Sequence, residues 1–224
     1  MKKEKELSRL RDELTQQRRN LPWQEIEKDY TFDGAGGKVK LLDLFGDTSQ
    51  LLEYHFMFGP DWKDGCKFCS MLADHDDPLI ADLNGSGVTL VAVSRALIET
   101  LMSHKQRMGW RFEWASSINN EFNRDFGVTF TQEEMEESRM NYNYQLGRFP
   151  VTECPGVSSF VRNEQGEIFH TYSAYARGLE NLLGIYNFLD LVPRGRDEAE
   201  LPYGMAWVRH HDRYDDDSFV EPYA

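Results

Sequence analysis

The chain has 224 residues, of which 40% are hydrophobic and 28% charged, so it is long enough to bury a sizeable core. Its formal net charge is −13, and a chain this acidic argues against nucleic acid or an anionic membrane as a partner, because both require a basic surface. No apolar run approaches the roughly 18 residues that a membrane-spanning helix needs. The charged segment 1–19 also lacks the apolar centre of a secretory signal, so we expect a cytoplasmic protein.

A charged helix is predicted over residues 3–20, where Leu7, Leu10 and Leu14 recur at spacings of three and four. This apolar stripe is narrow, so the helix either lies against its own domain or serves as the arm of a homodimer. We assign residues 1–30 to an N-terminal helical arm.

Short strands are predicted at 28–32 and 38–42, joined by a glycine-rich turn, and a third, apolar strand follows at 51–58. A turn-rich loop then leads to Cys66 and Cys69. These cysteines begin a predicted helix, and their spacing places both side chains on one face of it.

The first turn of a helix has backbone N–H groups without intrahelical partners, and these favour a thiolate. In such a place the pKa of a cysteine can fall from about 8.5 to roughly 3.5–7.5. We therefore expect Cys66 to be an exposed nucleophile and Cys69 a shielded, resolving thiol. A C-x-x-C pair can also be half of a zinc site or two ordinary buried thiols, and both alternatives stay open.

Strands and helices alternate through the rest of the chain. The predicted elements are a buried strand at 88–93, a helix from 94 or 95 to 108, a strand at 110–115, a helix at 117–126, an acidic insertion at 131–148, a hairpin of strands 156–162 and 167–172, and a helix at 178–191. This order predicts parallel β-α-β units, and the closing hairpin makes the sheet mixed. We expect the aromatic residues of the extension 196–224 (Tyr203, Trp207 and Tyr214) to pack on the body or on a partner subunit.

Seven segments carry a more specific resemblance. They are YHFMFGPDW (54–62), VTLVAVSR (88–95), RMGW (107–110), NRDFGV (123–128), FHTYS (169–173), YARG (175–178) and RHHD (209–212). Together with the C-x-x-C pair, they resemble a largely bacterial family of thioredoxin-like proteins that are described as predicted dithiol–disulfide oxidoreductases. The resemblance implies an α/β fold of the peroxiredoxin-like branch of the thioredoxin superfamily over residues 31–195. This fold is a three-layer α/β/α sandwich with a mixed central sheet.

The chain departs from the Trp-Cys-Gly-Pro-Cys motif of thioredoxins around its two cysteines. Lys67 and Phe68 replace the Gly-Pro pair, and Trp62 lies further upstream than the tryptophan of that motif. The residues between the two cysteines tune the redox potential, so we expect Lys67 and Phe68 to support the site.

Thioredoxins also place a cis-proline opposite the cysteines, at the start of the hairpin strand. Counting back from the turn at Gly166, this position falls on Ser158, and Pro155 would take it only in a shifted register.

Two further residues are candidates for supporting roles. Cys154 is either a third thiol within reach of Cys66 or a small buried hydrophobic residue. Arg95 follows a buried strand, at the edge of the sheet where ligands bind in such folds. It would bind a carboxylate or lower the pKa of a nearby thiol, or else form a surface ion pair.

The resemblance and the cysteine pattern together predict a thiol–disulfide oxidoreductase that needs no cofactor and no metal. Its partner would be a protein or small-molecule disulfide, which Cys66 attacks before Cys69 resolves the mixed disulfide. A thiol peroxidase is a close variant of this chemistry. The alternative of another class is a redox-inactive or metal-binding module, in which His210 or His211 would complete a zinc site with the cysteines.

Overall fold

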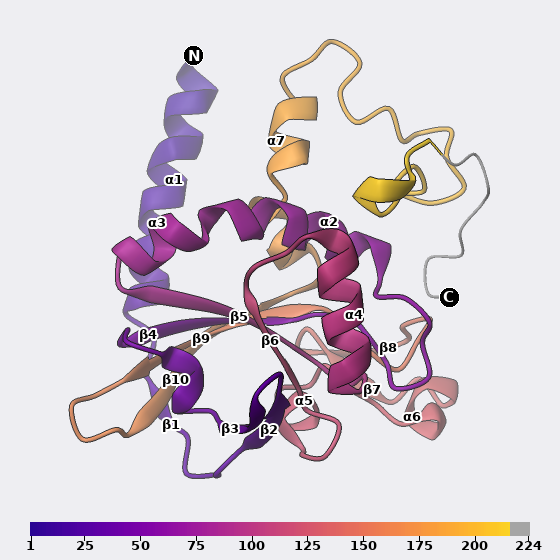
Figure 1. The fold of residues 1–224 in the computed structure, drawn as a ribbon. Helices are drawn as coiled ribbons and strands as arrows, with labels where there is room; N and C mark the ends of the chain where they lie inside the picture. The colour runs from indigo at the N-terminus through magenta and orange to yellow at the C-terminus, as the bar shows by residue number, and fades with distance from the viewer. Residues whose placement is uncertain (216–224) are drawn as a thin grey trace.

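A computed structural model describes residues 1–215 and shows a mixed sheet of eight strands in the order β1-β10-β9-β4-β5-β6-β2-β3 (Figure 1). The strands of this sheet are β1 (Gln24–Glu25), β2 (Thr31–Gly34), β3 (Gly37–Lys40), β4 (Gln50–His55), β5 (Val88–Ser94), β6 (Glu113–Ser116), β9 (Gly156–Arg162) and β10 (Ile168–Tyr175). A separate hairpin pairs β7 (Met140–Tyr142) with β8 (Gln145–Gly147).

Helices precede the sheet, connect its strands and follow it. The α-helices are α1 (Lys2–Arg19), α2 (Lys67–Asp76), α3 (Ile80–Gly85), α4 (Ile98–Met108), α5 (Phe122–Asp125), α6 (Gln132–Glu136) and α7 (Gly184–Leu189). The short 3-10 helices are η1 (Asp43–Phe45), η2 (Asp77–Leu79), η3 (Ala176–Leu182) and η4 (His211–Arg213). None of the helices within residues 1–215 is both long enough and apolar enough to cross a membrane.

The sheet has the mixed topology that the order of elements predicted. β4, β5 and β6 are parallel neighbours, and the connections between them run through α2 and α4. On its other side, β4 pairs antiparallel with β9, which pairs antiparallel with β10. This arrangement, closed by a C-terminal helix, confirms the predicted thioredoxin-like α/β fold.

Side chains alternate across β4 and so divide the core between the two faces of the sheet. Tyr54 and Phe56 pack toward α2 and α4, in the cluster that also contains Cys66 and Cys69. Leu51 points to the opposite face, which is covered by η1 and the short helix α5. In Figure 1, α2 and α3 run above the sheet, whereas α5 lies below it.

The predicted helix that follows β5 begins later than its sequence suggested. The backbone N–H groups of Arg95 and Ala96 both donate to the carbonyl of Phe58, at 3.2 and 2.8 Å. These bonds hold Arg95 and Ala96 in a bend, so α4 begins only at Ile98.

Two other predicted helices are shorter than expected. The N–H of Ser117 donates to Ser94, which postpones α5 to Phe122, where the side chain of Asn120 accepts the first N–H. The segment predicted as a helix at 178–191 divides into η3 and α7. In the acidic insertion, the predicted capping box of Thr131 and Glu134 is present and begins α6.

The two ends of the chain relate differently to the body. No residue of α1 is buried, the stripe of Leu7, Leu10 and Leu14 is exposed, and Figure 1 shows the helix pointing away from the sheet. In the extension, by contrast, Trp207 and Val208 pack against the core cluster of the cysteines.

Candidate active site

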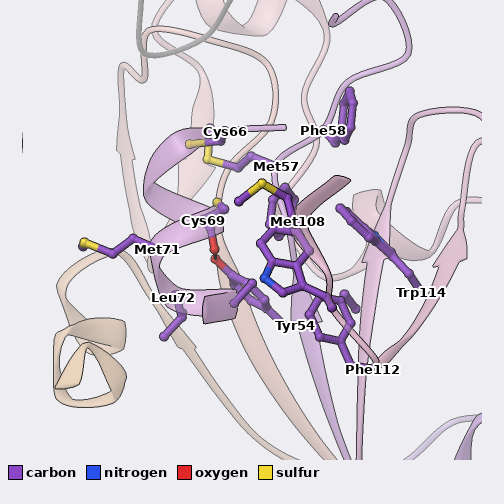
Figure 2. Packing of buried hydrophobic residues seen from close by; sticks show 14 of the residues in the cluster. Tyr54, Met57, Phe58, Cys66, Cys69, Met71, Leu72, Met108, Phe112 and Trp114 are labelled. Carbon is purple, nitrogen blue, oxygen red and sulfur yellow. Dashed lines mark hydrogen bonds between the residues drawn. The ribbon is translucent and has the colours of Figure 1, made fainter. Parts of the chain in front are cut away.

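Cys66 stands where the loop after β4 turns into α2. Its N–H donates to the carbonyl of Met57 at 3.0 Å, which fixes the end of the loop. Its own carbonyl accepts both the N–H of Ser70, at 2.8 Å, and the hydroxyl of Ser70, at 3.0 Å. Cys66 is therefore the N-cap of α2, and Cys69 lies within the first turn, as predicted (Figure 2).

This position favours the thiolate of Cys66. Burial raises the pKa of the thiol, but the thiol of Cys69 and the backbone N–H groups of Cys69 and Phe68 oppose that effect, with a smaller contribution from the charge of Lys67. The net effect lowers the pKa of Cys66 below its ordinary value. The structure thus supplies the electrostatic cause that the helix position predicted.

Cys69 has the opposite character. Burial raises its pKa well above the usual value, and the neighbouring Cys66 raises it further. The hydroxyl of Tyr54 donates to the backbone carbonyl of Cys69 at 3.3 Å, which ties this turn of α2 to β4. The pair therefore consists of one thiol that ionises readily and one that keeps its proton.

The expected exposure of Cys66 is wrong. Only 1% of Cys66 and 2% of Cys69 is exposed, because the loop before α2 and the C-terminal extension both cover this end of the helix. The two cysteines instead line a cavity of about 540 Å³. This volume is large enough for a small molecule beside the two cysteines.

The cavity walls come from distant parts of the chain. The cavity is lined by Phe149, just after the acidic insertion, by Pro155 before β9, by Leu179 of η3 and by Met205 of the extension. Its charged residues are two arginines and two glutamates, which lie in η3 and the extension (Arg177, Glu180, Arg196 and Glu198). The sequence drew attention to the extension through its aromatic residues and its histidines and gave no signal for these charged ones.

Ser158 does not line the cavity, which corrects the alignment that placed it opposite the cysteines; Pro155 does. Ser158 pairs with Glu53 in the register of β9 and β4, so it points away from α2. Its hydroxyl lies 2.8 Å from both the His55 ring and the Ser173 hydroxyl. Residues 1–215 contain no cis peptide bond, so Pro155 follows a trans bond.

The residues predicted to support the cysteine pair surround α2. Lys67 is buried, with its Nζ 5.3 Å from the centre of the Phe68 ring. Phe68 itself lines the cavity. Trp62 packs against the core cluster and so close to Gly59 that a Cβ there would lie 2.7 Å from the indole nitrogen. Phe68 is therefore the one of the three that lines the cavity, whereas Lys67 contacts Phe68 and Trp62 packs in the core beside the loop.

Arg95 and Cys154 lie outside the cavity. The guanidinium of Arg95 is 3.0 Å from the carboxylate of the buried Glu153. Arg95 thus forms an ion pair, the last of its predicted roles, although its partner is buried rather than on the surface. Cys154 packs with Val128, Phe130 and Met140, and burial raises its pKa well above the ordinary value. Its environment is that of a small buried hydrophobic residue.

The histidines of the extension have structural partners. The His210 ring lies 2.9 Å from the carbonyl of Gly65, and the His211 ring lies 2.7 Å from Asp74. Within residues 1–215, no group of three or more His, Cys, Asp or Glu side chains is arranged to hold a metal ion. The structure therefore gives the zinc alternative no supporting geometry.

The chain belongs to a family described as bacterial protein of unknown function (DUF899), whose model matches residues 1–214. No curated protein matches the sequence.

Several solved structures are similar in overall arrangement. The peroxidoxin BcpB from Mycobacterium tuberculosis is 12% identical, with a TM-score of 0.48 over 73% of this chain and 94% of that one. A cysteine-to-serine mutant of peroxiredoxin Q from Xanthomonas campestris is 14% identical, with a TM-score of 0.47 over 71% and 90%. A structure described as a putative thiol:disulfide interchange protein DsbE from Chlorobium tepidum is 16% identical, with a TM-score of 0.43 over 74% and 98%.

Proposed function

We propose that this member of the DUF899 family is a thiol–disulfide oxidoreductase in which Cys66 is the nucleophile and Cys69 the resolving thiol. One observation carries the proposal: Cys66 caps α2 with a lowered pKa, and Cys69, with a raised pKa, lies one turn later on the same cavity. An ionised thiol next to a protonated one is the arrangement that disulfide exchange requires.

The reaction has two displacement steps. The Cys66 thiolate attacks one sulfur of a substrate disulfide, the substrate S–S bond breaks, and a thiolate leaves and takes up a proton. Cys69 then loses its proton and attacks the Cys66 sulfur, which releases the second substrate thiol and forms the Cys66–Cys69 disulfide. The substrate gains two electrons, and an external dithiol restores the protein's reduced form.

The test compares Cys66→Ser, Cys69→Ser and Cys154→Ser in a turnover assay with hydroxyethyl disulfide and dithiothreitol. We expect Cys66→Ser to abolish the catalysed rate and Cys154→Ser to leave it unchanged. Cys69→Ser should accumulate a mixed disulfide with the substrate, visible as a mass increase. Full activity in Cys66→Ser, or stoichiometric zinc bound to the purified protein, would contradict the proposal.

Peroxidase chemistry at the same pair is the second candidate, because a cavity that excludes large substrates still admits a hydroperoxide. Here the Cys66 thiolate attacks a peroxide oxygen and becomes a sulfenic acid, while the peroxide leaves as an alcohol or water. Condensation with Cys69 then forms the disulfide and releases water. Turnover with cumene hydroperoxide, measured beside hydroxyethyl disulfide, decides between the two oxidants.

A further inference from the structure

We infer that residues 196–214 of the C-terminal extension restrict the cysteine pair to small, uncharged disulfides and exclude protein disulfides. The inference rests on the proposed function and adds a substrate class to it. Its first support is burial, since 1% exposure of Cys66 leaves its sulfur out of reach of a disulfide on a protein surface. The extension supplies part of that cover, because Gly204 and Met205 line the cavity beside the cysteines.

The extension touches the first turn of α2 directly. The Tyr203 ring meets the Phe68 ring edge-on, with 6.5 Å between their centroids. The Nζ of Lys67 lies 6.0 Å from the same Tyr203 ring. Residues 203–205 thus cover the two positions that separate Cys66 from Cys69, and we call these three residues the roof of the site.

Contacts before and after residues 203–205 hold them in place, some within the extension and some with the body. Before the roof, one carboxylate oxygen of Glu198 accepts three hydrogen bonds: from the Tyr186 hydroxyl at 2.9 Å, the Trp207 indole at 2.7 Å and the Met205 N–H at 3.1 Å. After it, Val208 is fully buried, and Arg213 pairs with Asp64 of the loop before Cys66 at 3.0 Å. An extension with this many contacts lies over the site as part of the fold.

The cavity under the roof suits a compact, neutral molecule. Its volume of about 540 Å³ lies in the range of small-molecule sites, roughly 300–1,000 Å³. The two arginines and two glutamates on its walls balance in charge, and Glu180 accepts ion pairs from both Arg177 and Arg196. The remaining lining is mostly apolar. Among the described residues Glu198 forms no ion pair, but neutral donors bond to its carboxylate, and both arginines are paired, so the cavity offers no unpaired cation to recruit an anionic substrate.

The test uses the full chain with dithiothreitol as the reductant and compares hydroxyethyl disulfide with insulin. Wild-type protein should favour the small disulfide by about 100-fold in kcat/KM, because insulin reacts only with the fraction of molecules whose roof is open. The double variant Tyr203→Ala/Met205→Ala should gain insulin reduction and narrow this ratio at least ~10-fold. Tyr214→Ala is the matched control, since Tyr214 is an exposed aromatic of the same extension outside the cavity wall, and it should keep the wild-type ratio.

A second measurement follows access to Cys66 without turnover. N-ethylmaleimide should alkylate wild-type Cys66 readily, whereas a long-chain polyethylene glycol maleimide, which carries the same reactive group, should react slowly with wild type and quickly only with the double variant. Equal wild-type rates with insulin and the small disulfide, or equal rates with the two alkylating reagents, would overturn the inference while leaving the proposed function intact. Failure to reduce either disulfide, with Cys66 unreactive toward N-ethylmaleimide at neutral pH, would overturn the proposed function itself.

Discussion

An acidic group lies at each end of α2, and the pKa values of the two groups are shifted in opposite directions. At the first end, Cys66 is buried, and yet its pKa lies below the ordinary value. At the last turn, burial raises the pKa of Asp76 to about 7. Cys66 is fully buried and Asp76 is half-buried, so desolvation alone would raise both pKa values.

The direction of the helix accounts for the difference. Unpaired N–H groups face a side chain at the beginning of a helix, whereas the end presents carbonyl oxygens. Cys66 has the N–H groups of Phe68 and Cys69 beside it, and Asp76 has no comparable donors to oppose its desolvation. A thiol can therefore be both buried and reactive when it lies at the N-terminal end of the helix.

The largest expected effect is on thiol reactivity. Alkylation of the wild-type protein should follow a thiolate with a pKa below the usual value of about 8.5. Removing this thiol with Cys66→Ser should lower the alkylation rate at pH 7 by about 10- to 100-fold. Cys154→Ser is the control, since its thiol is buried and its pKa raised. Identical rates in wild type and Cys66→Ser would show that the N-terminal end of α2 does not activate the Cys66 thiol.

The next effect concerns stability at the other end of the helix. The pKa of Asp76 is higher in the folded state than in the unfolded chain, so folded molecules bind more protons and stability falls as pH rises from about 4 to 7. Asp76→Asn removes this loss. Since each pKa unit is worth about 1.4 kcal/mol and the side chain keeps some exposure, we expect a gain on the order of 2 kcal/mol at pH 8.

Urea denaturation of Asp76→Asn and wild type at pH 4 and pH 8 measures this effect. The variant should gain stability at pH 8 and change little at pH 4, where Asp76 is already protonated in the folded state. A gain of the same size at both pH values would contradict the assigned cause.

A smaller effect on stability is expected from Tyr54, whose hydroxyl bonds to Cys69 between the two ends of α2. Tyr54→Phe removes the hydroxyl that donates to the Cys69 carbonyl and should cost about 1 kcal/mol of unfolding free energy. The alkylation pH profile should stay as in wild type, because Tyr54 is not among the groups that lower the pKa of Cys66. A shifted profile would mean that Tyr54 contributes to thiolate stabilisation directly.

The smallest effect should come from Lys67. Its charge is the last of the causes that lower the pKa of Cys66, so Lys67→Met should raise that pKa only slightly. The alkylation pH profile of the variant gives the value, and Lys63→Met, a nearby lysine of the preceding loop, is the control. A rise of two units or more would make Lys67, rather than the backbone of α2, the main stabiliser of the thiolate.

Local patterns predicted the elements of the site but not their surroundings. An apolar strand, a loop and one-turn spacing were enough to place Cys66 and Cys69 at the beginning of a helix. The burial of Cys66 depends on Met205, which is remote in the chain and has no periodic pattern to reveal its contact. Ser158 was misplaced for a related reason, since only the pairing of β9 with β4 decides which side of the sheet it faces.

The lengths of the helices show the same limit. The segments before α4 and α5 have apolar spacing that suits a helix, but hydrogen bonds from Ala96 to Phe58 and from Ser117 to Ser94 hold them in bends and turns. Tertiary contacts of this kind override local preference. They occur beside the site because the loop after β4 and the end of β5 meet there.

The exposed helix α1 has a consequence for how the molecule opens. With no buried residue, its 18 residues are held mainly by the bonds of the helix itself and by surface pairs such as Arg9 with Glu13. At its last turn, the Arg18 guanidinium contacts the Tyr172 ring of β10, 5.0 Å from the ring centre. A solitary helix of this length is only marginally stable in water. Its amide hydrogens should therefore exchange with solvent far sooner than those of β4 and β5, so α1 would form a separate unfolding unit whose loss leaves the sheet protected.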